Sequence, residues 1–142
     1  MWKSLQRWWR GSRPRDAAAP LGARGEDLAA EHLVAGGMRI LARGSRDRLG
    51  ELDLVALDGQ TVVFVEVKTR RTGDAGHPAD AVDARKQRKL TLLAVSYLKR
   101  HGLLRQASRF DVVAITWATD GEPKLDHIRG AFEAQGRDSF YS

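Results

Sequence analysis

The stretch GELDLVALDGQTVVFVEVKTRR, residues 50–71, predicts the two strands around which the rest of the chain is organised. Residues 52–57 and 62–67 form two largely apolar runs, and the second is rich in the β-branched and aromatic side chains that favour strands. Asp58-Gly59 between the runs is a strong signal for a tight hairpin turn. The stretch therefore predicts an antiparallel hairpin.

Charged side chains interrupt this apolar hairpin. Because side chains alternate along a strand, Glu66 and Lys68 project from one face of the second strand. By the same rule, Glu51 and Asp53 share a face of the first strand. A short turn at Asp58-Gly59 places Asp53 opposite Phe64, whereas a slightly longer loop places Asp53 opposite Glu66. Either register brings two or three carboxylates and one ammonium group together.

Two interpretations of these charges stay open. In the first, Glu66 and Lys68 lie on a solvated face of the sheet and form a weak surface pair. In the second, Asp53 and Glu66 bind a divalent cation through hard oxygen ligands, and the lysine beside them steers a water or stabilises charge on a phosphate. A carboxylate buried in so apolar a strand is costly without such a partner.

Composition limits the classes of function. The chain of 142 residues is long enough for one domain with its own core. It has no cysteine, which excludes disulfides, thiolate zinc sites and cysteine nucleophiles, and its four histidines lie far apart without ligand spacing. No apolar run approaches the length of a membrane span, so we expect no stable membrane insertion and a cytoplasmic protein.

The positive charge is concentrated at the N-terminus. Of the net charge of +6, residues 1–24 contribute five, since they contain six basic residues and one acidic residue. Residues 1–20 are predicted to be a flexible, basic, Trp-rich extension that precedes a domain at 21–132 and a C-terminal tail at 133–142. The extension could be a disordered segment, an electrostatic arm for nucleic acid or an interfacial membrane anchor.

The remaining periodicities predict the other elements of the domain. In chain order they are a helix at 22–36, a strand at 38–46, a helix that begins at residue 80 or 83 and ends at 100, a strand at 110–117 and a short edge strand at 124–128. In the first helix Leu33 and Val34 belong to the apolar stripe. In the strand at 38–46, Met38, Ile40 and Ala42 share one face. Phe132 is expected to anchor the C-terminal tail.

Two polar residues lie on the inward faces of the helices. Glu26 precedes Leu33 by two helical turns, either because the helix dipole favours a carboxylate there or because it is a third acidic group at the hairpin site. Gln87 points inward near the start of the second helix, among basic residues. That start is either an ordinary solvated face or a surface that faces phosphates, with Gln87 orienting a water or a phosphate oxygen.

Several motifs in the right order resemble those of the YraN-like family. They are Gly25-Glu26, GELDLV at 50–55, FVEVKTR at 64–70 and Lys86-Gln87, within a region of resemblance that covers residues 21–132. This bacterial family resembles the Holliday-junction resolvases of the PD-(D/E)XK nuclease superfamily. The resemblance implies an α/β fold with a restriction-endonuclease-like core, in which a mixed β-sheet is flanked by helices in the order α-β-β-β-α-β.

The resemblance also implies which residues form the site. Asp53, Glu66 and the Val67 carbonyl would bind Mg²⁺ (or Mn²⁺), and Lys68 would position the attacking water. Glu26 would complete the acidic cluster, and Gln87 would support it.

The implied activity is metal-dependent cleavage of nucleic acid, most readily of structured DNA such as junctions or flaps. Seven basic residues near the motifs are predicted to contact the backbone: Arg43, Arg46, Arg70, Arg71, Arg85, Lys86 and Lys89. A resolvase would act as a symmetric homodimer, since a four-way junction is cut in two places. Two alternatives remain: a catalytically silent nucleic-acid-binding module of the same fold, or a small adaptor recruited through its N-terminal extension.

Overall fold

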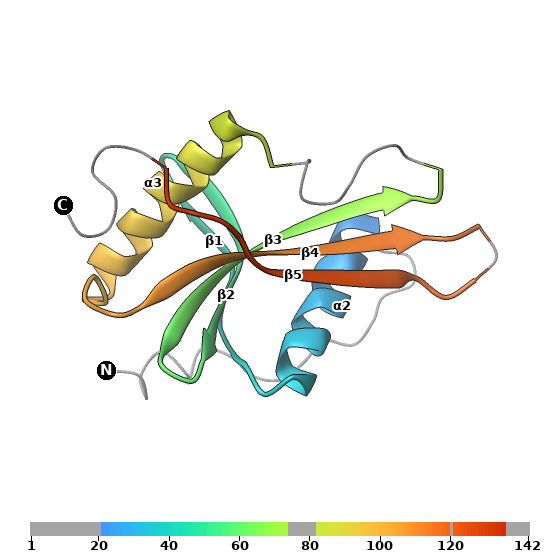
Figure 1. The fold of residues 1–142 in the computed structure, drawn as a ribbon, viewed down its shortest axis with the longest axis horizontal. Coiled ribbons are helices and arrows are strands. Elements are labelled where there is room, and N and C mark those ends of the chain that lie inside the picture. Colours follow the sequence, from blue (N-terminus) through green and yellow to red (C-terminus); the bar gives the residue numbers. More distant parts are fainter. Residues whose placement is uncertain (1–20, 74–81, 120, 136–142) are drawn as a thin grey trace.

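The computed structural model describes residues 21–73, 82–119 and 121–135. This part of the chain folds into two helices and one five-stranded sheet (Figure 1). The elements in chain order are α2 (Leu21–Ala35), β1 (Arg39–Asp47), β2 (Gly50–Asp58), β3 (Thr61–Arg71), α3 (Ala84–Arg100), β4 (Ser108–Trp117) and β5 (Lys124–Phe132). The predicted extension at 1–20 and most of the loop before α3 lie outside the described residues.

The strands lie in the order β1-β2-β3-β4-β5. Neighbouring strands are antiparallel except for β3 and β4, which are parallel because α3 returns the chain between them. The predicted α/β fold with a mixed sheet and flanking helices is therefore confirmed. β5 is longer than the predicted edge strand and contains Phe132, whose ring stacks on that of Phe110 with 4.6 Å between the ring centroids.

The two helices cover opposite faces of the sheet, so the core has two layers (Figure 1). α3 packs through Leu93 and Tyr97 against side chains such as Phe64. α2 packs through Ala30 and Leu33 against the other face. The prediction for Val34 is wrong: its side chain is 44% exposed. No helix among the described residues is long and apolar enough to cross a membrane.

The hairpin of β2 and β3 adopts the second of the two predicted registers. Asp58 pairs with Thr61, so the turn consists of residues 59–60 and not of residues 58–59. The last regular pair toward the other end is Leu54 with Val65, and one step further the same register brings Asp53 level with Glu66.

Gly59 has a φ of +61°, a backbone conformation that residues other than glycine adopt only at a cost in free energy. No atom lies within 4 Å of the position that a Cβ would take. We therefore expect Gly59→Ala to lower the free energy of unfolding by about 1 kcal/mol through backbone strain alone. Urea unfolding should show this loss, whereas Gly22→Ala, in an open helical position, should be neutral or stabilising. A Gly59→Ala protein as stable as the wild type would contradict the expectation.

A β-bulge in β1 changes which way its side chains point. The register with β2 shifts between Ile40 and Ala42. Ile40 packs in the core beneath α2, whereas Leu41 and Ala42 pack on the side of α3. The predicted common face of Met38, Ile40 and Ala42 is therefore wrong. As a consequence of the extra residue, Arg43 turns toward α2.

Candidate metal centre

Three carboxylates converge between α2 and β2. Glu26 comes from α2, and Glu51 and Asp53 come from β2. Each offers an oxygen atom, and these three atoms all lie within 4.8 Å of one another. All three side chains are partly buried. We refer to Glu26, Glu51 and Asp53 as the acidic triad.

The local path of β2 produces this arrangement. Leu52 packs on the α3 side of the sheet and Leu54 on the α2 side, so the regular alternation is interrupted at Asp53. Glu51 and Asp53 consequently both turn toward α2 and Glu26. Asp53 Oδ2 accepts a hydrogen bond of 2.9 Å from the Val67 N–H, at the point where the regular pairing of β2 and β3 has ended.

The triad carries more negative charge than its surroundings compensate. Burial, followed by repulsion from Glu66, raises the pKa of Asp53 to about 7, although the Val67 N–H acts in the opposite direction. Burial also raises the pKa of Glu26, and the nearby Arg43 offsets this only in part. Carboxylates that disfavour one another's ionisation in a partly buried site are typical of sites that bind a cation or exchange protons.

The helix dipole does not account for Glu26. The first turn of α2 contains no acidic residue, and Glu26 is the sixth residue of the helix. Because the helix dipole acts within the first turn, it does not explain why a carboxylate lies at this position. Its position beside Glu51 and Asp53 agrees with the other interpretation, that of a third acidic group at the site.

Glu66 adjoins the triad from the other face of the sheet. It is 8% exposed, and its Oε1 lies 2.5 Å from the Lys86 ammonium at the start of α3. Burial acts to lower the pKa of Lys86, but the hydrogen bond and charge of Glu66 outweigh this and raise it. The predicted metal pair of Asp53 and Glu66 is thus close enough to interact, and Glu66 already has a cationic partner.

Residues 25–115 match a family described as "Uncharacterised protein family UPF0102". The chain belongs to this family. A UPF0102 protein of Rhodopirellula baltica is 49% identical over 131 residues, which cover 89% of this chain and 78% of the relative. A UPF0102 protein of Rhodococcus jostii is 51% identical over 112 residues, which cover 79% of this chain and 95% of the relative. The resemblance to the YraN-like family that the motifs indicated is confirmed, and the matched region contains the whole acidic triad.

Among solved structures, SfsA of Pyrococcus furiosus in complex with Ca²⁺ is similar to this UPF0102 protein. The match has a TM-score of 0.36 and 15% sequence identity, and it covers 78% of this chain and 63% of SfsA. The two folds are therefore only remotely alike.

The other two predicted catalytic residues, Lys68 and Gln87, come from β3 and α3. Lys68 follows Glu66 by two residues in β3, and its side chain is exposed. Gln87 is half-buried in the first turn of α3, where its amide Nε2 donates a hydrogen bond of 2.9 Å to the Val82 carbonyl. In this structure of the UPF0102 protein, Gln87 therefore fixes the backbone segment that leads into α3.

Besides Lys86, which contacts Glu66, two more of the predicted nucleic-acid residues contact acidic side chains. Arg43 Nη2 lies 2.6 Å from Asp27 Oδ1, and Arg46 Nη2 lies 2.6 Å from Glu51 Oε2. The sequence predictions omit Asp27 because the bulge that turns Arg43 toward it leaves no signal in the sequence. The predictions for the site also omit Glu51, although its position two residues before Asp53 was a usable signal.

The remaining basic residues predicted to bind nucleic acid lie in β3 and α3. Arg70 Nε donates a hydrogen bond of 3.1 Å to Thr116 Oγ1. The side chains of the other three are exposed to solvent: Arg71, Arg85 and Lys89. Their contact with nucleic acid stays a prediction.

Proposed function

We propose that this UPF0102 protein is a metal-dependent endonuclease that cleaves phosphodiester bonds of nucleic acid, with structured DNA such as junctions or flaps as the favoured substrate. The observation that carries the proposal is the acidic triad, in which three carboxylate oxygens lie within 4.8 Å of one another and burial, together with repulsion from neighbouring carboxylates, raises the pKa of Glu26 and of Asp53. Without a bound cation or proton, repulsion among these carboxylates destabilises the fold. The resemblance of the YraN-like family to Holliday-junction resolvases supports structured DNA as the substrate.

The donor atoms fit Mg²⁺ or Mn²⁺. The triad offers oxygen ligands alone, and hard divalent cations prefer carboxylate and carbonyl oxygens. Asp53 would be the central ligand, with Glu26 and Glu51 beside it and Glu66 and the Val67 carbonyl at its edge. Bound there, Mg²⁺ would lower the pKa of a coordinated water and polarise the scissile phosphate.

The chain's own residues would orient and stabilise the reacting groups. Lys68 is exposed on the strand that carries Glu66, where its ammonium group would offset negative charge that develops on the phosphate. Gln87 would keep the start of α3 in place beside the site through its bond to Val82. Exposed arginines and lysines would bind the phosphate backbone, which positions a substrate without reading its sequence.

Lys68→Ala tests the proposal. We expect cleavage of duplex, single-stranded, flap and four-way-junction DNA to require Mg²⁺ or Mn²⁺ and to stop with a chelator. Loss of the ammonium group should slow the preferred reaction about 10²-fold, because a single group that stabilises transition-state charge has an effect of that order. Lys124→Ala removes an equally exposed lysine from β5 and should cleave like the wild type.

Binding of all substrates without cleavage under any metal would overturn the proposal and favour a silent binding module. Equal cleavage by Lys68→Ala and Lys124→Ala would remove Lys68 from the mechanism. Deletion of residues 1–20 addresses the adaptor alternative, because an adaptor would lose its localisation while the cleavage of a nuclease domain would persist.

A further inference from the structure

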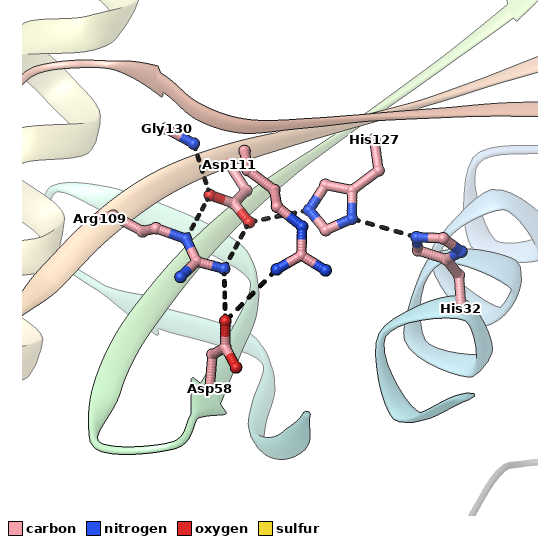
Figure 2. Close-up of polar contacts among 7 residues, drawn as sticks. His32, Asp58, Arg109, Asp111, His127 and Gly130 are labelled. Atoms are coloured by element: carbon pink, nitrogen blue, oxygen red, sulfur yellow. Dashed lines mark hydrogen bonds and ion pairs between the residues drawn. The ribbon is translucent and has the colours of Figure 1, made fainter. Parts of the chain in front are cut away.

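A second polar cluster, apart from the acidic triad, joins β4, β5 and α2 around Asp111 (Figure 2). Asp111 is fully buried in β4. Its Oδ1 accepts hydrogen bonds of 3.0 Å each from Arg109 Nε and from the Gly130 N–H. Its Oδ2 lies 2.8 Å from His127 Nε2. Since an ionised carboxylate only accepts, His127 donates through Nε2, and in the neutral imidazole Nδ1 then carries a lone pair.

That lone pair meets a second imidazole. His127 Nδ1 lies 3.1 Å from His32 Nε2, with the two rings nearly perpendicular at 80° (Figure 2). The His127 side chain is 7% exposed, whereas His32 lies on the exposed side of α2. The buried nitrogen of His127 and the accessible nitrogen of His32 therefore lie next to each other at the surface, although 95 residues separate the two histidines in sequence.

We propose that His32 Nε2 and His127 Nδ1 bind a transition-metal ion such as Zn²⁺ or Ni²⁺. Two nitrogens on a tetrahedral zinc ion, each at about 2.0–2.1 Å, are about 3.3 Å apart, close to the observed separation. Asp111 stands where metal-binding histidines have their carboxylate partner, on the ring nitrogen that does not bind the metal. Imidazole ligands favour zinc, nickel or copper over magnesium, so this site differs in chemistry from the acidic triad.

The surrounding charges suit a site of moderate affinity. Arg109 neutralises Asp111 and also contacts Asp58 at 2.9 Å, and Arg129 contacts the same Asp58 carboxylate at 3.4 Å. Burial, then His127 and then Arg129 lower the pKa of His32, which favours the neutral imidazole that metal binding requires. The positive charge of Arg129 also opposes the binding of a cation. Because the two histidines fill only two positions of a tetrahedral ion, we expect water or an added ligand to take the other two.

Metal binding by the two histidines does not depend on nuclease activity. Chelator-treated full-length protein would be titrated calorimetrically with Zn²⁺ in excess Mg²⁺, which competes for oxygen ligands. We expect one zinc ion to bind the wild type and a His101→Gln control, whose substituted histidine lies at the end of α3. His32→Gln should weaken binding at least about tenfold, since loss of even an outer partner of a metal ligand has an effect of that size.

A second readout separates metal binding from a structural role of the histidines. Because His32 is exposed, its replacement should leave the fold intact, which circular dichroism would verify. Co²⁺ should give the visible absorption of a nitrogen-ligated ion in the wild type and in His101→Gln, but not in His32→Gln. Zinc affinity that is unchanged in His32→Gln, or that falls equally in the His101→Gln control, would overturn the proposal.

Discussion

Asp53→Asn is expected to abolish cleavage and, at pH 8 without metal, to raise the stability of the protein. Loss of a metal ligand removes several kcal/mol of transition-state stabilisation, and about 4 kcal/mol corresponds to a rate about 10³-fold lower. The gain in stability has a separate cause. An ionised Asp53 is repelled by Glu66 within a partly buried site, and the neutral amide is not.

The sign of the pH dependence follows from the pKa of Asp53. It is 3.8 in the unfolded chain and about 7 in the folded protein, so the folded state holds the extra proton between these values. Stability from this group is fully present below about pH 4 and is lost as the pH rises through about 7. A rise from 3.8 to about 7 corresponds to at most about 4 kcal/mol, and we expect Asp53→Asn to recover about half of this at pH 8.

Urea unfolding with a chelator at pH 5 and pH 8 measures this effect. The wild type should lose stability between the two conditions, whereas Asp53→Asn should lose much less. Mg²⁺ should stabilise the wild type more than the variant. Asp126→Asn, which changes a carboxylate of β5 outside the triad, is the matched control and should follow the wild type. An Asp53→Asn protein that is less stable than the wild type at pH 8 would contradict the electrostatic account.

Asp111→Ala should have the largest effect on stability, a loss of about 3–5 kcal/mol. The fully buried carboxylate accepts hydrogen bonds from Arg109, His127 and the Gly130 N–H. Its removal would leave a guanidinium group and a backbone N–H without their acceptor inside the protein. Asp58→Ala removes the half-exposed carboxylate that also contacts Arg109, and we expect it to cost less than about 1 kcal/mol.

The pH dependence of Asp111 has the opposite sign from that of Asp53. Burial acts to raise the pKa of Asp111, but hydrogen bonds from His127, Arg109 and Gly130 outweigh it and lower the pKa. Its stabilisation is therefore present above about pH 4 and is lost on acidification below that value. Urea unfolding at neutral pH should separate the two variants clearly. Similar losses for Asp111→Ala and Asp58→Ala would show that burial does not set the strength of this network.

The hairpin and both helices could be predicted from sequence because their apolar residues follow the periods of strands and helices over long runs. Contacts between distant segments could not. The register of the hairpin depends on a one-residue difference in the turn at Gly59, and the direction of Arg43 depends on the bulge in β1. Asp111 lies in an apolar run, and although Arg109 is two residues away, its other two partners, His127 and Gly130, are 16 and 19 residues away.

The bulge in β1 also bears on aggregation. β1 is an outer strand of the sheet, and an outer strand with unpaired backbone groups is a template on which another chain can add a strand. A bulge interrupts the regular spacing that such addition needs. We therefore expect the bulge to oppose the addition of a second chain at the β1 edge.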